Sequence, residues 1–337
     1  MVEYISTFPT GFEEIVAENI HSFLKGTSIL RVYHGLIRYA YWGNPNDINR
    51  VPFFNNSYSV LRFFEGKSLC FSRMVSEIAS AKLRYPMRDG SFRVRFSKSN
   101  QFAGVEKRVS AQAESAVRNS SRLELDRLNP ATELWYVIRD EGFGFYGQLL
   151  RKRAATEKNL HQGELRPEFA CLLCCCGKPA QDSVILDPFA GYGSIPALIA
   201  RHFPFSRLIV GDIDQNKVQN LRQALPADDA RIQVFCGDAL DLAGIADGSV
   251  DLILTDPPWG YYEDIGDIAL FYRGMLREWG RILKKDGRAV VLSAREEEFA
   301  QAAGHSGAFA IERTIHTLVN GKKAGVYILK SNAGGFS

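Results

Sequence analysis

The sequence predicts an α/β protein whose C-terminal part forms a mostly parallel sheet with a terminal antiparallel hairpin, preceded by an α+β region. Three observations support this fold class. From about residue 183 onward, short apolar stretches alternate with helical stretches, and most of the apolar ones are bounded by Gly or Asp. Near the C-terminus, Asn320-Gly321 separates two further strand candidates. The first 150 residues instead mix amphipathic helices with strands.

The apolar stretches of the C-terminal part are short and largely uninterrupted by polar residues. Such strands, alternating with helices, indicate a parallel sheet that is covered on both faces. A helix is predicted at 195–201, after the first strand. The dipeptide Asn-Gly favours a hairpin turn, so 313–319 and 324–329 should form an antiparallel pair. The other predicted strands are 184–186, 207–210, 232–235, 250–254 and 289–292.

The N-terminal part is predicted to be organised separately. Helices are expected at 11–24 and 72–83, and strands at 91–96 and 133–138. A basic, polar stretch then follows, and such composition is typical of a linker between domains. Because 337 residues exceed one ordinary domain, we expect a boundary within the linker 151–164.

Composition and charge restrict the class of protein. With 46% hydrophobic and 23% charged residues, the chain looks globular. It contains no apolar run of roughly 18 to 20 residues and no secretory signal pattern, so we expect a soluble, cytoplasmic protein. Residues 1–160 hold 23 Lys and Arg against 16 Asp and Glu, while the rest hold 18 against 22. The first half would therefore attract a polyanion, although an ordinary basic surface is the alternative.

Four of the six cysteines lie within residues 171–176. Cys171 and Cys174 form a Cys-x-x-Cys, which raises a metal or redox site as an alternative. No second ligand pair stands at the spacing of a zinc finger, and the neighbouring Phe, Ala and Leu residues indicate a buried helix. We therefore expect small apolar thiols in a core, and no metal ion.

A glycine-containing loop follows the first predicted strand. It begins at Asp187 and includes Gly191 and Gly193 just before the predicted helix. Glycines let the backbone approach a ligand closely, and open parallel sheets bind ligands beyond the carboxyl ends of their strands. An acid in this loop would repel phosphates but suit a ligand that carries an ammonium group.

Two further acids end the next two predicted strands. Asp212 lies about 20 residues beyond the loop, where an acid can accept both ribose hydroxyls. Asp238 follows the third strand and is placed to accept from an adenine amino group. The loop has Pro196 where the third glycine of a Gly-x-Gly-x-x-Gly would stand, and a pyrophosphate would benefit from that glycine. The set favours S-adenosylmethionine over NAD, against the alternative that these acids only cap helices and turns.

The most informative motif is Asp256-Pro257-Pro258-Trp259, directly after the strand 250–254. Two prolines make the chain rigid, so the Asp256 side chain and adjoining carbonyls become fixed hydrogen-bond acceptors. Acceptors on an exocyclic amino group push its nitrogen toward a nucleophilic geometry and disperse charge as the proton leaves. Trp259 would stack on the base, and a rigid turn with a core tryptophan is the structural alternative.

In order along the chain, these four motifs resemble those of the class I methyltransferases that modify amino groups of nucleobases. The resemblance covers about 165–330 and implies a Rossmann-like fold. It implies catalytic roles for Asp256, Pro257, Pro258 and Trp259. The cofactor-binding residues that it implies are Asp187, Phe189, Ala190, Gly191, Gly193, Asp212, Ile213, Asp238, Ala239 and Asp256.

The upstream half resembles the THUMP-containing RNA methyltransferases, including those that form N2-methylguanosine in tRNA. The similar segments are 6–15, 92–96, 107–109, the strand after 128–130, and the linker stretches 150–153 and 163–168. The resemblance implies a ferredoxin-like segment at 1–50, a THUMP RNA-binding domain at 51–150 and a methyltransferase domain at 165–337. Two residues depart from the family pattern: Trp259 replaces Tyr or Phe, and Tyr192 replaces a small residue.

The implied activity is methyl transfer from S-adenosylmethionine to the exocyclic amino group of a base in RNA, with tRNA and guanine N2 as the first expectation. Adenine N6 in RNA, the amide of a protein glutamine and a non-catalytic RNA-binding role are the alternatives, and a small activating protein partner stays open. No membrane partner is expected. The basic residues expected to contact phosphates are Arg93, Arg95, Lys98, Lys107, Arg108, Arg151, Lys152 and Arg153.

Overall fold

A computed structural model describes residues 2–83, 85, 90–152, 160–261 and 264–332. The chain folds into two compact units. The N-terminal unit comprises Met1–Phe8 and Ile20–Arg153, and the C-terminal unit comprises Pro9–Asn19 and Ala154–Ser337. The predicted boundary at residue 50 and the predicted linker 151–164 stay predictions, and most of the linker's first half lies outside the described residues.

The N-terminal unit is built on one sheet that has nine strands in the described part of the chain, in the order β2-β3-β1-β4-β9-β8-β5-β6, with β7 beside β5. The sheet runs without interruption through strands from both sides of residue 50. Its strands are β1 (Glu3–Thr7), β2 (Ser28–Tyr33), β3 (Leu36–Ala40), β4 (Ser57–Glu65), β5 (Ser91–Lys98), β6 (Gln101–Phe102), β7 (Glu124–Leu125), β8 (Thr132–Arg139) and β9 (Phe143–Arg151).

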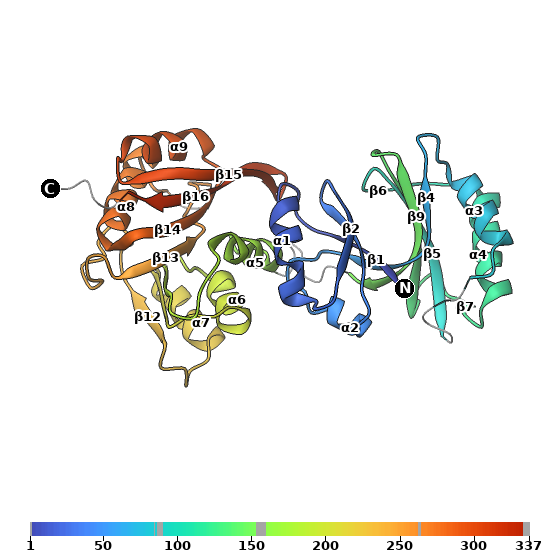
Figure 1. The fold of residues 1–337 in the computed structure, drawn as a ribbon, viewed down its shortest axis with the longest axis horizontal. Coiled ribbons are helices and arrows are strands. Elements are labelled where there is room, and N and C mark those ends of the chain that lie inside the picture. Colours follow the sequence, from blue (N-terminus) through green and yellow to red (C-terminus); the bar gives the residue numbers. More distant parts are fainter. Residues whose placement is uncertain (1, 84, 86–89, 153–159, 262–263, 333–337) are drawn as a thin grey trace. The chain divides into compact units, whose positions relative to one another are not determined.

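The helices of the N-terminal half are α1 (Glu13–Phe23), α2 (Pro45–Ile48), α3 (Phe71–Ser80) and α4 (Lys107–Ser120). Helices α3 and α4 lie side by side along the sheet (Figure 1). Met74 and Ile78 of α3 share a buried cluster with Phe92 and Phe96 of β5. Because side chains alternate along a strand, the odd-numbered residues of β5 point to the opposite face of the sheet. The predicted helices 11–24 and 72–83 correspond to α1 and α3.

Among the residues that the structure describes, the C-terminal unit holds a seven-stranded sheet in the order β12-β11-β10-β13-β14-β16-β15. The first five of these strands are parallel, and β14, β16 and β15 pair in an antiparallel manner. The predicted fold class is therefore confirmed, including the terminal hairpin. The strands are β10 (Val184–Asp187), β11 (Arg207–Asp212), β12 (Ile232–Cys236), β13 (Val250–Thr255), β14 (Leu283–Ser293), β15 (Phe309–Val319) and β16 (Lys322–Ser331).

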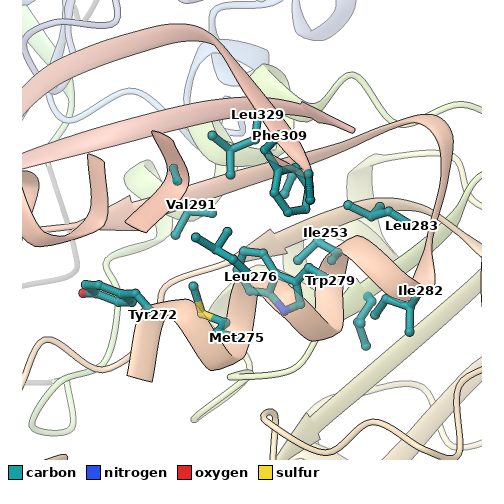
Figure 2. Packing of buried hydrophobic residues seen from close by; sticks show 14 of the residues in the cluster. Ile253, Tyr272, Met275, Leu276, Trp279, Ile282, Leu283, Val291, Phe309 and Leu329 are labelled. Carbon is teal, nitrogen blue, oxygen red and sulfur yellow. The ribbon is translucent and has the colours of Figure 1, made fainter. Parts of the chain in front are cut away.

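The helices of the C-terminal half are α5 (Pro167–Gly177), α6 (Ser194–His202), α7 (Gln215–Ala224), α8 (Ile268–Ile282) and α9 (Glu296–His305). Apolar residues of α8 recur at helical spacing and form one buried face. Figure 2 shows Leu276 and Trp279 of this helix facing Ile253, Val291 and Leu329 of the sheet. This packing fixes the central strands, whose carboxyl ends carry the acidic motifs.

Helix α5 contains the cysteine cluster. Cys171, Cys174, Cys175 and Cys176 are all buried, and burial raises the pKa of the Cys174 thiol well above its usual value. The prediction of a buried helix carrying small thiols is therefore confirmed. None of the helices in the described ranges has the length and apolar character that crossing a membrane requires.

Candidate active site

A cavity of about 470 Å³ lies in the C-terminal unit, where β10, β11, β12 and β13 reach their carboxyl ends. In the strand order, β11 and β10 lie on one side of this point and β13 on the other, so the direction in which strands are added reverses here. Such a switch point opens a crevice for ligands in parallel sheets. Nearly all the predicted site residues line the cavity: Asp187, Phe189, Ala190, Gly191, Asp212, Ile213, Asp238, Ala239, Asp256, Pro257, Pro258 and Trp259.

Asp187 is the last residue of β10 and is buried. Its Oδ1 accepts hydrogen bonds from the Thr255 hydroxyl at 2.7 Å and the Phe189 amide at 3.2 Å. Its buried Oδ2 has no hydrogen-bond partner among the described residues. Burial raises the pKa of Asp187 to about 7, against the two hydrogen bonds and with help from the nearby Asp212. A buried acceptor without a partner is costly, so this oxygen is ready for a donor that a ligand supplies.

The loop after β10 turns the backbone against the cavity. The Ala190 amide donates to the Gly211 carbonyl at 2.9 Å, and the Gly191 amide donates to Asp212 Oδ2 at 3.0 Å. Gly191 has φ +54°, and a Cβ atom there would meet nothing closer than 4.0 Å, so the backbone borders open space. The loop therefore exposes its main chain to a ligand.

Gly193 differs from the other predicted loop residues because it does not line the cavity. It has φ +90° and precedes α6, and a Cβ atom there would lie 3.0 Å from the Leu221 side chain of α7. Its amide donates to the Ala190 carbonyl at 2.8 Å. The structure thus gives Gly193 a role in the turn and in packing, and its predicted cofactor contact stays a prediction.

Three further residues, at or just after the ends of β11 and β12, line the cavity. Asp212 is buried and accepts from the Gly191 and Asp214 amides, one on each carboxyl oxygen, which leaves further lone pairs on both oxygens. Ile213 is 70% exposed beside it and offers an apolar face. Asp238 is exposed, and its Oδ1 accepts from the Leu240 amide at 2.9 Å. An exposed apolar side chain and two carboxylates in the same cavity suit a ribose and a flat purine.

The Asp-Pro-Pro-Trp corner follows β13 and borders the same cavity. Asp256 Oδ1 is buried and lacks a hydrogen-bond partner within the described part of the chain. Burial raises the pKa of Asp256 well above its usual value, and the negative charge of Asp187 raises it further, while Trp259 opposes the rise. A carboxyl group in this state gains from donors placed against it, and it binds a proton readily.

Trp259 is half-buried and is held from two sides. Its indole Nε1 donates to the Leu292 carbonyl of β14 at 3.3 Å, and its own carbonyl accepts from Arg295 Nε at 2.9 Å. The indole therefore lies at the cavity wall with a fixed orientation, and it is not part of the buried core. A flat ring bound in this part of the cavity would therefore contact the indole, next to Asp256.

Sequence reasoning missed several residues of the cavity. Phe271 of α8 lies 5.7 Å from Phe189 between ring centroids and closes one wall. Thr255 supplies the hydroxyl that fixes Asp187, and its position beside the predicted Asp256 was the only available signal. Tyr261 and Lys322 border the cavity from the loop after Trp259 and from the β15–β16 hairpin. Contacts between separate elements bring these residues to the cavity.

The predicted phosphate contacts lie in the N-terminal unit and do not share one surface. Arg93 forms an ion pair with Glu133, and both side chains are mostly buried. Arg95 lies over the Phe102 ring at 5.4 Å, on the sheet face opposite α3 and α4. Lys98, Lys107, Arg108 and Lys152 are exposed, and Lys107 and Arg108 begin α4. Arg153 and the side chain of Arg151 lie outside the described residues.

Comparisons with known proteins identify a methyltransferase domain in this chain. A family model described as RMKL-like, methyltransferase domain, matches residues 153–324. The chain is 29% identical over 243 residues to a Bos taurus protein named tRNA (guanine(6)-N(2))-methyltransferase THUMP3, which covers 64% of this chain and 46% of the relative. It is 26% identical over 176 residues to an Archaeoglobus fulgidus tRNA (guanine(6)-N2)-methyltransferase, covering 44% of each. The chain thus matches less than half the length of these curated relatives.

Among solved structures, the chain is similar to TrmN from Thermus thermophilus. The TM-score is 0.81 with 22% sequence identity, and the match covers 98% of this chain and all of the other. At this level of identity, the likeness shows a shared fold that extends through both units.

Proposed function

This chain belongs to the RMKL-like methyltransferase family, and from that premise we propose that it methylates the exocyclic N2 of guanine in RNA, with tRNA as the substrate and S-adenosylmethionine as the methyl donor. The observation that carries the proposal is the Asp256 corner, whose unpartnered carboxyl oxygen and adjoining indole border the cavity that begins at Asp187. The relatives named above are tRNA guanine-N2 methyltransferases, and this supports the same reaction for this chain.

The residues of the cavity fit S-adenosylmethionine. Its ammonium group would satisfy the unpartnered Oδ2 of Asp187, its ribose hydroxyls would bind Asp212, and its adenine would lie on Ile213 beside Asp238. When bound, S-adenosylmethionine supplies an activated methyl carbon on a sulfonium. Because the donor is already activated, positioning by the protein supplies most of the catalysis.

Asp256 favours guanine over adenine by its chemistry. The Watson–Crick edge of guanine places the N1 and N2 donors side by side, and a carboxylate accepts from both. Adenine places an N1 acceptor beside its amino group, and this acceptor would face a carboxylate oxygen. In the proposed reaction Asp256 orients the amino nitrogen, and then accepts the proton that the nitrogen loses. A raised pKa suits a group that must take up a proton near neutral pH.

Trp259 and the two prolines hold the base against Asp256. The prolines fix the backbone after β13, and the indole offers a stacking surface of a kind worth about 1–3 kcal/mol per base. A base within a helix would first have to leave the stack, at a cost of a few kcal/mol. A stacking surface next to a carboxyl acceptor suits a flat ring that carries an amino group.

The N-terminal unit is the proposed RNA-binding part. We retain a ferredoxin-like segment at 1–50, a THUMP domain at 51–150 and a linker at 151–164 as proposals, supported by the resemblance and by the excess of basic residues before residue 160. A tRNA substrate also supports the cytoplasm as the compartment. Among the proposed phosphate contacts, Lys98, Lys107, Arg108 and Lys152 have exposed side chains.

One experiment separates the proposed reaction from its alternatives. Purified protein is incubated with labelled S-adenosylmethionine and either unmodified tRNA or total protein, and the digested products are identified by mass spectrometry. N2-methylguanosine is the expected product. N6-methyladenosine or methylated glutamine would replace the proposed substrate, and cofactor binding with no product on either substrate would favour a binding protein.

A further inference from the structure

A cluster of cationic and aromatic side chains borders the cavity beside Trp259, and the predicted site did not include it. Tyr261 is 42% exposed, and its ring lies 6.2 Å from the Trp259 ring at 81°. Lys322 Nζ lies over the Tyr261 ring at 3.6 Å, and the Arg295 guanidinium lies over it at 4.8 Å. We call Tyr261, Arg295 and Lys322 the rim cluster.

The β15–β16 turn and a hydrogen bond to the Trp259 backbone hold the rim cluster in position. Asn320 and Gly321 have φ +51° and +79° and form the tight turn between β15 and β16, where Val319 pairs with Lys322. Both turn residues therefore have the positive φ that a type I′ turn needs. Arg295 donates to the Trp259 carbonyl, which links the cluster to the catalytic corner. The cation–π contacts orient both cations toward the Tyr261 ring, and the Arg295 guanidinium also lies 3.9 Å from the Glu298 carboxylate.

The charge around the rim cluster makes its cations significant. Residues 161–337 hold more acidic than basic residues, and Asp238 and Asp264 border the same cavity. A polyanion approaching this cavity is therefore repelled unless cations stand at the entrance. Lys322 lines the cavity, and Tyr261 and Trp259 line it as well.

We propose that Lys322 of the rim cluster binds a backbone phosphate next to the target nucleotide, so that the base enters the cavity beside Trp259 with its phosphate held at the entrance. This inference rests on the proposed RNA substrate and adds a phosphate subsite in the C-terminal unit. Tyr261 and Arg295 position Lys322 and the corner, and the ligand class is a phosphodiester of single-stranded or flipped-out RNA.

The test compares Lys322→Ala, Lys322→Arg and the control Lys323→Ala. Lys323 is the next residue of β16, is exposed and does not line the cavity, because neighbouring side chains of a strand point to opposite faces. The affinity for an unmodified tRNA transcript is measured over a range of salt, with saturating S-adenosylhomocysteine. The affinity for S-adenosylhomocysteine alone is measured in parallel.

Lys322→Ala should weaken RNA binding by roughly two- to tenfold and reduce the slope of log affinity against log salt by about 0.7 to 0.9. Lys322→Arg should retain the slope, and Lys323→Ala should behave as the wild type. S-adenosylhomocysteine affinity should be unchanged in all three. An unchanged slope for Lys322→Ala would overturn the inference, and so would a loss of S-adenosylhomocysteine affinity, which would place Lys322 on the cofactor.

The proposed function has a separate readout. Wild-type protein that binds the transcript with the expected salt slope but forms no N2-methylguanosine would refute the reaction and leave the phosphate subsite standing. If the wild-type protein forms N2-methylguanosine while Lys322→Ala binds RNA as the wild type does, the proposed reaction stands and the phosphate subsite is refuted.

Discussion

The Thr255 hydroxyl donates a 2.7 Å hydrogen bond to Asp187 Oδ1 and so joins the ends of two neighbouring strands, β13 and β10. Both residues are buried. Thr255 immediately precedes the Asp-Pro-Pro-Trp corner, which we propose to be catalytic, and Asp187 begins the loop of the proposed cofactor site. This hydrogen bond therefore links the proposed site of the methyl donor to the proposed site of the acceptor, at the ends of two strands that also pair in the sheet.

Replacing Thr255 by Val should test this link, because Val keeps the shape and removes the donor. The variant should lose about 1–2 kcal/mol of unfolding free energy, and its affinity for S-adenosylhomocysteine should fall severalfold. Denaturant unfolding and calorimetric titration measure the two effects. Thr255→Ser, which keeps the hydroxyl, is the matched control and should bind normally. Equal affinity in both variants would show that the bond does not shape the cofactor site.

The pKa of Asp187, raised to about 7, predicts a pH dependence of cofactor binding. An ammonium group binds the ionised carboxylate, so the dissociation constant of S-adenosylhomocysteine should rise as pH falls below 7, by up to about tenfold per pH unit. Titrations from pH 5.5 to 8 measure it. Asp187→Asn should bind weakly and show little pH dependence. A steep dependence that survives in Asp187→Asn would assign the titration to another group.

The same shift affects stability in the opposite direction. A carboxyl group whose pKa is higher in the folded state holds more protons when folded than when unfolded. The unfolding free energy of the ligand-free protein should therefore fall as pH rises from about 4 to about 7, between the usual and raised values. Denaturant unfolding at several pH values checks this, and Asp187→Asn should reduce the fall. The buried Asp256 has a shift of the same sign, so part of the fall should remain.

Much of the C-terminal unit was predictable because its signals are local. Apolar stretches marked β10 to β13, and acids at their ends were expected at one edge of a parallel sheet. Asn320-Gly321 marked the hairpin because few residues accept a positive φ. Strand order then gathers the strand ends by rule, which is why nearly all the predicted site residues line one cavity.

The features that the sequence did not predict depend on contacts between segments that are distant in the chain. Gly193 lies outside the cavity lining, and its packing against Leu221 of α7 is not visible in the loop sequence. Arg93 resembled a phosphate contact, but its partner Glu133 lies on β8, the adjacent strand. Phe271 reaches the cavity from α8, and Lys322 reaches it from the hairpin, whose turn dipeptide predicts a fold and not a ligand site. Pairing and packing determined these outcomes, and local pattern does not encode them.

Arg93 and Lys107 should therefore respond differently to substitution. Arg93→Ala leaves the mostly buried Glu133 without its ion-pair partner and should destabilise the protein by about 1–3 kcal/mol. Lys107→Ala should leave stability unchanged and lower the salt slope of tRNA binding by roughly 0.7 to 0.9. Thermal unfolding and salt-dependent binding measure the two. If Arg93→Ala has normal stability but a reduced salt slope of tRNA binding, Arg93 contacts a phosphate.

Trp259 should contribute to the reaction with tRNA through the stacking surface of its ring. Trp259→Phe keeps a smaller stacking face but loses the hydrogen bond to the Leu292 carbonyl, so the KM for tRNA should rise severalfold. Trp259→Ala removes the face entirely and should reduce kcat/KM by roughly tenfold to a hundredfold. Steady-state kinetics measure both variants, with S-adenosylhomocysteine affinity as the control. Normal kinetics in Trp259→Ala would remove the proposed stacking role.

The most direct measurement is single-turnover methyl transfer to unmodified tRNA by Asp256→Ala and by the wild type, with nucleoside mass spectrometry as the readout. The wild type should form N2-methylguanosine, and the variant should be slower by roughly a hundredfold or more, while its affinity for S-adenosylhomocysteine stays within a few fold. A variant that forms the product at the wild-type rate, or one that fails only because it no longer binds the cofactor, would contradict the role given to Asp256.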